Sequence, residues 1–511
     1  MSAHYSAARI RQGVLHFLVG KVGSALLTFC GFLLVARLLL PADYGRYVAL
    51  IALVELGMNL ASLGMDWVST RYVPAYRVKA GGRALSRFVW RLVGMQALAL
   101  AVVATALAAA APWLATLLAL GDMVPALRLY ALYLLLEGLC RVMRDQMLAQ
   151  LLLQGRAQLA LLLRHLVWVG LALALWAHQH SATLWAVAAI ELAAAAVGLL
   201  AASAGLGHAL RQAVREGGDA AADWQPPSTA DLRHLATNSY LGLLLNIPAR
   251  PQVITLLVTR LAGLEAAALY GFARSLADQV LRFLPAELLL GFLRPGMVAR
   301  HVQSGRFDTL NQQTNTLLVV SLLVLAPLLA LVIGRGDLLV QVLGAGRFDG
   351  SGALLALMLL AAALFSHRRM LEFVANTVGC PQAISQASVL LLAVPVAVVA
   401  LLSADWPVWT VPAAALLFEC LFSVLAIRLL RRFGVAYVPP VAAAGRIALL
   451  VAAVAGGLAI LPIALPAGWA IVLLGAVALS GSALLGWLLR PLDPAARDML
   501  QSLLKKKGKP L

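Results

Sequence analysis

The chain has 511 residues, of which 62% are hydrophobic and only 12% are charged. Soluble domains usually have about a quarter of their residues charged, so this composition excludes a soluble globular protein and indicates a polytopic membrane protein. The apolar runs have the length of helices and lack the ten-residue alternation of an outer-membrane barrel. We therefore expect an all-α fold.

Runs of about twenty apolar residues, the length that crosses a bilayer as a helix, recur along the whole chain. The sequence predicts fourteen spans, at about 14–40, 44–70, 86–111, 124–150, 157–177, 182–204, 233–259, 266–293, 311–334, 351–378, 383–403, 407–430, 442–463 and 467–489. An even number of spans places both termini on the same side of the membrane.

The basic residues are distributed unevenly between the connections of these spans. The predicted turns at 112–123, 176–184, 403–408 and 462–468 contain neither Lys nor Arg. By the positive-inside rule, both termini are then cytoplasmic, and this asymmetry accounts for most of the net charge of +18. The charge does not indicate nucleic acid as a partner. The basic tail "LLKKKGKP" is expected to touch anionic lipid head groups.

An internal repeat indicates two halves of equal orientation. A Tyr-Gly pair at 44–45 recurs 226 residues later, and an Arg eleven residues before a Gly, first at 144, recurs 224 residues later. Parallel repeats of this kind place the substrate path between the halves of a transporter. The predicted organisation is an N-lobe of spans one to six (1–204), a cytoplasmic linker loop (205–232), a C-lobe of spans seven to twelve (233–432), spans thirteen and fourteen (433–490) and a basic cytoplasmic tail (491–511).

Charged residues within membrane spans normally face a partner or a wet cavity. Arginines outnumber acids near the middle of the predicted spans, which leaves a net positive interior. Planar guanidinium groups bind phosphate bidentately, so a cationic cavity suits an anionic head group. The candidate substrate-binding residues are Arg250, Arg274, Arg282, Arg37 and Arg368. The candidate ion-coupling or charge-pair residues are Asp278, Glu55 and Asp66.

The alternative is that these charges pair and hold helices together. In that case Asp278 bridges Arg274 and Arg282, and Arg368 pairs with Glu372. Further charged or titratable residues inside the predicted spans are Arg128, Glu137, Arg144, Asp145, Arg164, His165 and Glu191 in the first half and Arg369 and Glu419 in the second. Among them, Arg144 can pair with Asp145 or with Glu137.

Two predicted spans are interrupted by helix breakers. The segments "NIPARPQ" at 246–252 and "FLPAELLLGF" at 283–292 fall in the seventh and eighth spans. Broken helices often mark hinges or binding sites in transporters, although a packing kink explains either segment alone.

Motifs of common enzymes and metal sites are missing from the sequence. It has no GxxxxGK[ST] phosphate loop, no GxSxG and no HExxH. The four cysteines are not spaced as metal ligands or as a disulfide framework. We therefore expect no cofactor, no metal and no enzymatic activity.

Residues 33–73, "LLVARLLLPADYGRYVALIALVELGMNLASLGMDWVSTRYV", resemble the opening of the bacterial polysaccharide (Wzx-type) flippases, a family of the multidrug/oligosaccharidyl-lipid/polysaccharide exporter superfamily. The resemblance lies in Arg37, Pro41, the Asp43-Tyr44-Gly45 turn and Leu63-Gly64. The glycine turns "LLLQGRAQ" and "NTVGCPQA" are also similar to that family. The corresponding turn of the second repeat, "GLEAAALYG", departs from the signature.

The resemblance implies two lobes of six helices around a central cleft lined by spans one, two, seven and eight. It implies a flippase that moves undecaprenyl-pyrophosphate-linked oligosaccharide across the inner membrane by alternating access, for surface polysaccharides such as O-antigen or for exopolysaccharide. The implied partners are this lipid-linked oligosaccharide, membrane lipids, a polysaccharide polymerase and a chain-length regulator.

Three alternatives stay open. A lipid II flippase of the same superfamily also has fourteen spans. A drug exporter would line its cavity with acids, against the excess of arginine. A membrane glycosyltransferase or polymerase would need a large outer loop or a DxD-type site, whereas the longest predicted outer turn, about 335–350, is short.

Overall fold

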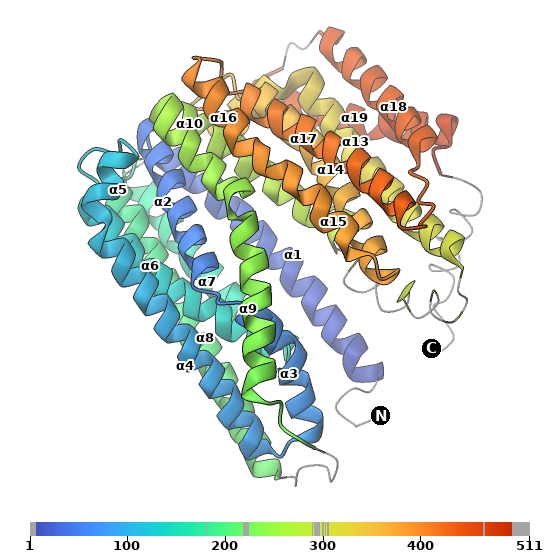
Figure 1. Cartoon of the computed structure of the whole chain (residues 1–511). Coiled ribbons are helices and arrows are strands. Elements are labelled where there is room, and N and C mark those ends of the chain that lie inside the picture. Colours follow the sequence, from blue (N-terminus) through green and yellow to red (C-terminus); the bar gives the residue numbers. More distant parts are fainter. Residues whose placement is uncertain are drawn as a thin grey trace. The chain divides into compact units, whose positions relative to one another are not determined.

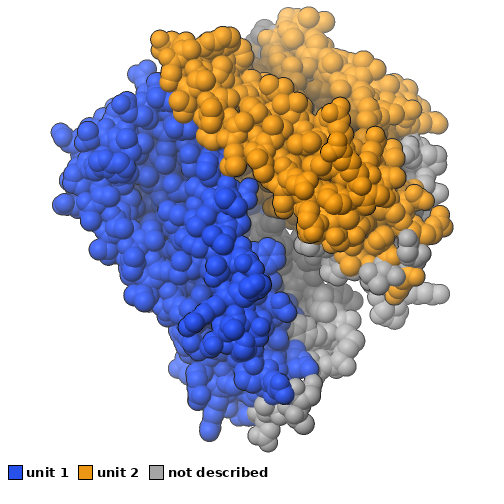
Figure 2. All heavy atoms as spheres, in the orientation of Figure 1, with its two compact units in different colours: residues 1–268 blue, residues 269–511 orange. Residues whose placement is uncertain are grey.

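The computed structural model describes residues 7–179, 181–217, 224–288, 306–462 and 465–492, together with 290, 297, 298, 301 and 303, with side chains from Val22 onward. All regular secondary structure in these residues is helical, and they contain no strand (Figure 1). The prediction of an all-α membrane protein is confirmed. The chain divides into two compact units, residues 1–268 and 269–511, which are described separately below (Figure 2).

Unit 1 is a bundle in which α1 packs on α7, α7 on α8, and α6 on both α4 and α8. Its helices are α1 (Ala7–Leu38), α2 (Pro41–Leu60), α3 (Met65–Lys79), α4 (Gly82–Ala109), α5 (Ala111–Leu117), α6 (Val124–Arg141), the π-helical segment η2 (Val142–Leu148), α7 (Gln154–Gln179), α8 (Leu184–Glu216), α9 (Thr229–Asn246), the 3₁₀ turn η3 (Ile247–Ala249) and the first part of α10 (Pro251–Phe283).

Helices α2 and α3 form one bent pair, and the sequence explains both its start and its bend. Pro41 is the first residue of α2, where its missing N–H costs no helical hydrogen bond and its fixed φ suits the helix. The bend between the two helices is 55°. It ends at Gly64, whose φ of 70° lies in the left-handed region that favours glycine.

A second break separates α9 from α10. Pro251 disfavours the helical conformation in the residue before it, and Arg250 accordingly is extended, with φ −72° and ψ 145°. Further along, Gly263 interrupts α10 with φ 87° and ψ 176°. The proline pair of the "NIPARPQ" segment therefore places Arg250 in an extended conformation between two helices, in the middle of an apolar stretch.

Unit 2 is built around the long helix α13, which packs on α14, α18 and α19, while α14 packs on α17. Its helices are the rest of α10, α11 (Pro285–Leu288), α13 (Phe307–Gly344), α14 (Gly352–Thr377), α15 (Pro381–Ser388), the 3₁₀ turn η4 (Val389–Leu392), α16 (Ala393–Ser403), α17 (Thr410–Arg432), α18 (Val441–Ile460) and α19 (Ala467–Leu489).

The connection between α17 and α18 is anchored by Tyr437, whose side chain is fully buried. Its hydroxyl donates to Asn315 Oδ1 at 3.2 Å and lies 3.3 Å from His367 Nε2. Burial raises the pKa of Tyr437 above its usual value. The hydroxyl therefore keeps its proton and donates to Asn315 at any physiological pH.

Arg335 joins α13 to the end of α18. It departs from helical geometry (φ −148°, ψ 35°) and donates from Nε to Leu458 O at 2.9 Å, and from Nη2 to Ala459 O at 2.9 Å and Leu461 O at 2.7 Å. The last carbonyls of a helix lack partners and carry partial negative charge, so a guanidinium stabilises them. Because α13 continues to Gly344, the outer turn predicted at 335–350 is shorter than expected.

Ten described helices are long and apolar enough to cross a membrane, or eleven if α2 and α3 form one bent span. One of them is the helical stretch Thr229–Phe283, which contains the predicted span 233–259 and most of the predicted span 266–293. The chain is thus a multi-pass membrane protein. The number of fourteen spans, the repeat of two six-helix lobes and the domain boundaries stay predictions. The centre of the linker (218–223) and the tail beyond residue 492 lie outside the described residues.

Candidate functional site

The break between α9 and α10 lies against α2 and forms a polar cluster with it. Arg250 Nη1 donates to Asn59 Oδ1 at 2.9 Å, and Gln252 Nε2 donates to Glu55 Oε2 at 2.9 Å. Asn59 Nδ2 in turn donates to the backbone oxygen of Glu55 at 2.8 Å. We call Glu55, Asn59, Arg250 and Gln252 the α2–α10 polar cluster. It brings together two of the predicted site residues, Glu55 and Arg250.

The charge of Arg250 is not neutralised within this cluster. Its side chain is half-buried, and its acceptor, Asn59 Oδ1, is an uncharged amide oxygen. Among the described residues, no carboxylate forms an ion pair with Arg250. A half-buried guanidinium that bonds only an amide can exchange that bond for two charge-assisted bonds to a phosphate. The cluster therefore has the chemistry of an anion site.

Glycines fix α2 on either side of the cluster. A Cβ on Gly45 would lie 2.0 Å from Leu264 O, and one on Gly64 would lie 2.2 Å from Ala236 O. Tyr240 of α9 also donates to Leu60 O at 2.8 Å. The Tyr44-Gly45 pair of the sequence signature lies within α2 rather than in a turn between helices, and it marks a close backbone approach between α2 and α10 that only glycine permits.

Two other predicted residues of unit 1 lie outside the α2–α10 polar cluster. Asp66 is exposed at the start of α3 and accepts a hydrogen bond from Gln146 of η2. Arg37 is half-buried in the last turn of α1, where a cation is favoured by the helix dipole.

The remaining candidates lie in unit 2, and several of them are paired. Arg274 Nε is 3.5 Å from Asp278 Oδ2, one helical turn away, and Arg282 is exposed on the same helix. Arg368 lies 2.8 Å from Glu419 and 3.4 Å from Glu372. The Arg368–Glu372 pair that the sequence offered as an alternative is therefore present.

Arg368 also packs over aromatic rings. Its guanidinium carbon is 4.9 Å from the centre of the Phe365 ring and 5.5 Å from that of Phe422. With two carboxylates and two rings around it, this guanidinium is better suited to join α14 and α17 than to bind a further anion. The binding role of the predicted residues of unit 2 stays a prediction.

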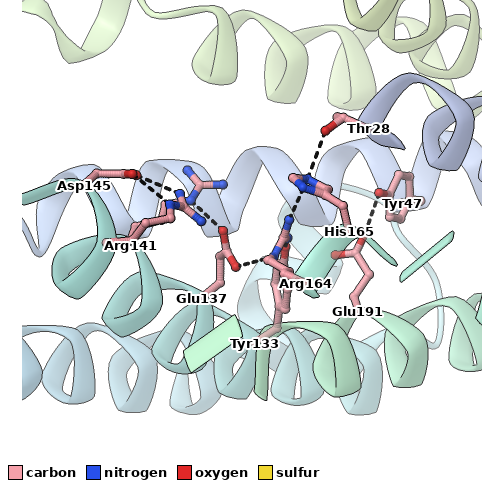
Figure 3. A network of polar contacts seen from close by, with 10 residues as sticks. Thr28, Tyr47, Tyr133, Glu137, Arg141, Asp145, Arg164, His165 and Glu191 are labelled. Atoms are coloured by element: carbon pink, nitrogen blue, oxygen red, sulfur yellow. Dashed lines mark hydrogen bonds and ion pairs between the residues drawn. The ribbon is translucent and has the colours of Figure 1, made fainter. Parts of the chain in front are cut away.

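A buried ionic network occupies the interior of unit 1 (Figure 3). Glu137 of α6, with an exposed fraction of 1%, lies between Arg141 and Arg164. Its two oxygens are 2.8 Å from Arg141 Nε and 2.7 Å from Arg164 Nε. Arg164 also donates to the hydroxyl of Tyr133 at 2.9 Å and to His165 Nε2 at 3.2 Å.

The network extends to neighbouring helices. Thr28 Oγ1 of α1 lies 2.9 Å from His165 Nε2 of α7, and Tyr47 of α2 donates to Glu191 of α8 at 2.7 Å. In η2, Arg144 binds Asp145 through two hydrogen bonds of 2.8 and 2.7 Å, one of the two pairings predicted for it. π-helical turns are rare and frequently lie at functional sites.

Sequence reasoning recognised the charged members of this network one by one but not Arg141 or the hydroxyl partners Thr28, Tyr47 and Tyr133. One signal was available, because Glu137 and Arg141 are four residues apart and face the same side of a helix. The hydroxyl partners come from other helices and leave no such signal. Among the described residues, no three His, Cys, Asp or Glu side chains form a group that fits a metal ion.

Two solved structures of membrane transporters are similar to this chain in fold. The chain is similar to the lipid II flippase MurJ in an inward closed conformation, with a TM-score of 0.60 and 12% identity over 93% of this chain and 99% of that one. It is also similar to a multidrug resistance MATE family transporter of the MOP superfamily in an inward-facing conformation, with a TM-score of 0.53 and 13% identity over 80% and 94% of the two chains. The fold is therefore that of MOP-superfamily transporters.

Residues 10–285 match the model of the polysaccharide biosynthesis protein family, and the chain belongs to this family. The resemblance inferred from the opening signature is confirmed. No curated protein sequence matches the chain.

Proposed function

We propose that the protein is a flippase that moves an undecaprenyl-pyrophosphate-linked oligosaccharide across the inner membrane by alternating access. The proposal depends mainly on one observation about Arg250. Its guanidinium lies at a helix break inside the membrane domain, and its hydrogen-bond partner is a neutral amide. Membership of the polysaccharide biosynthesis family and the fold of a MOP-superfamily transporter support the proposal. The transported glycan serves the assembly of surface or exopolysaccharide.

The chemistry of the substrate suits the α2–α10 polar cluster. A pyrophosphate presents several charged oxygens, and a guanidinium binds two of them in parallel. Gln252 holds Glu55 through a hydrogen bond of 2.9 Å, and Glu55 is the carboxylate of the cluster that would carry a coupling proton or ion. The polyprenyl chain stays in the bilayer, so the protein has to accommodate only the head group and sugars.

The helix breaks supply hinges for alternating access. The bend between α2 and α3 and the break before α10 lie on the two elements that form the cluster. A ligand shifts a conformational equilibrium only by its differential affinity for the two states. Pyrophosphate provides such a difference if Arg250 exchanges its hydrogen bond to Asn59 for bonds to pyrophosphate in only one of the two states.

The function is tested by deleting the gene and identifying the lipid-linked glycan that accumulates. We expect loss of the surface polymer and accumulation of the complete repeat unit on undecaprenyl pyrophosphate, out of reach of an impermeant sugar-labelling reagent. Labelling of the accumulated glycan from outside would indicate loss of a polymerase instead. Accumulation of lipid II would identify a lipid II flippase, and an unchanged lipid pool would contradict the proposal.

The orientation is tested by thiol labelling. In a variant whose four cysteines are replaced by serine, single cysteines at Gln179 and Asp405 should react with an impermeant maleimide in intact cells, because these turns lack basic residues. A cysteine at Ala80, next to Lys79 and Arg83, should react only after lysis. Labelling at position 80 in intact cells would contradict the proposed cytoplasmic location of both termini and indicate the opposite orientation.

Further partners belong to the same proposal. A flippase of this class delivers its cargo to a polysaccharide polymerase and a chain-length regulator, and membrane lipids surround it. We propose that it carries out transport without catalysis.

A further inference from the structure

A groove of about 460 Å³ lies between α4 and α8 in unit 1. Ser86 and Trp90 of α4 line one side, and Leu210, Arg211 and Arg215 of α8 line the other. The two helices touch at the first residue of α4, since a Cβ on Gly82 would lie 2.0 Å from Ala213 O. The groove is thus formed by the packing of α4 against α8.

The groove has a cationic rim, formed by Arg211 and Arg215, which lie one turn apart on α8 and line it. Arg83, Arg87 and Arg91 follow one another at four-residue spacing along α4 and share a face of that helix, but they do not line the groove. All five are exposed, and none forms an ion pair with a described residue. Arg211 uses Nε to donate to Gly207 O at 3.2 Å, which leaves its two terminal nitrogens for a ligand.

The acidic residue nearest in sequence does not neutralise this rim. Glu216, the last residue of α8, accepts a hydrogen bond of 2.8 Å from Gln212. Arg211 and Arg215, one turn apart and without a paired carboxylate among the described residues, repel each other, and a bound anion relieves that repulsion. The unpaired positive charge therefore favours the binding of an anionic ligand.

The position of the groove identifies the class of this ligand. Both helices pass from the arginines directly into apolar stretches long enough to cross a membrane. Trp90 is 43% exposed at this transition, and tryptophan with arginine is the usual composition of the membrane interface. Basic pockets between transmembrane helices bind the head groups of anionic lipids.

We propose that the α4–α8 groove binds one anionic phospholipid. Its phosphate lies between Arg211 and Arg215, and its acyl chains run along Trp90, Gly207 and Leu210 towards the bilayer centre. This site is separate from the α2–α10 polar cluster and does not depend on the transported substrate. A rim that merely follows the positive-inside rule would attract anionic lipids diffusely and would not use the groove.

The proposal is tested by native mass spectrometry of the full chain in detergent, titrated with phosphatidylglycerol. Arg211→Gln with Arg215→Gln should weaken binding of the first lipid roughly 30-fold, since each arginine near a membrane surface contributes about a factor of five. The matched control is Arg431→Gln with Arg432→Gln, which removes two exposed arginines at the end of α17 and should bind as the wild type does. Equal weakening in both double variants would show diffuse attraction and overturn the proposal.

The variant Ser86→Trp tests the shape of the groove independently of its charge, because the larger side chain fills the groove and every arginine stays in place. We expect it to lose the first bound phosphatidylglycerol while keeping the thermal stability of the wild type. Unchanged binding by Ser86→Trp would contradict the proposal, as would equal affinity for zwitterionic phosphatidylethanolamine. Displacement of the lipid by inorganic phosphate, or stronger binding of undecaprenyl phosphate than of phosphatidylglycerol, would assign the groove to a different ligand.

Discussion

Glu137→Gln should strongly destabilise the protein, by about 3–5 kcal/mol in the free energy of unfolding, the usual effect of removing one partner of a buried ion pair. The neutral amide leaves the positive charge of Arg164, whose side chain is 13% exposed, without its carboxylate. Arg141 is 43% exposed, so the uncompensated burial of Arg164 accounts for most of the loss. Denaturant unfolding in detergent micelles measures this loss.

Glu265→Gln is the matched control, because it makes the same chemical change at an exposed position of α10. It should alter stability by less than about 0.5 kcal/mol. The double variant Glu137→Gln with Arg164→Met should recover much of the loss, since removing both charges avoids an uncompensated buried cation. If Glu137→Gln unfolds at the same denaturant concentration as the wild type, the network does not stabilise unit 1.

Arg250→Gln should reduce export of the lipid-linked glycan by about 30-fold or more, because truncating a charged, hydrogen-bonded partner typically costs 2–5 kcal/mol. Arg250→Lys should retain part of the activity, since lysine keeps the charge but not the planar fork. Flipping of the purified lipid-linked glycan in proteoliposomes measures the effect. Arg260→Gln, an exposed arginine ten residues further along α10, is the matched control and should export normally.

The partner of Arg250 allows a sharper test. Asn59→Asp introduces a carboxylate 2.9 Å from Arg250 Nη1, so an ion pair would neutralise the cation and export should fail as in Arg250→Gln. Asn59→Ala removes the hydrogen bond without adding charge, so Arg250 stays available and most of the activity should remain. Full export by Asn59→Asp would mean that Arg250 serves the structure rather than the pyrophosphate.

The opening of the chain shows how far local sequence predicts this fold. Pro41 and Pro251 restrict backbone conformation, and Gly64 permits the left-handed conformation that other residues rarely adopt. The start of α2, its bend and the break before α10 therefore follow from single residues. Helix-length apolar runs likewise determine the class of fold. The signature around Gly45 predicted the family, but its physical role, the close approach of Leu264 O, depends on a helix more than 200 residues away.

For the candidate site too, some features follow from local sequence and others depend on the packing of distant helices. The sequence by itself determined that arginines lie inside membrane helices and that Arg250 sits at a break, because burial preference and backbone restriction are local properties. Only the tertiary structure decided that Arg250 faces the neutral Asn59, that Arg368 faces Glu419, and that Glu137 pairs with Arg164. The partner of a charge depends on which helices pack together and on how each is rotated about its axis, and hydrophobic periodicity leaves both undetermined.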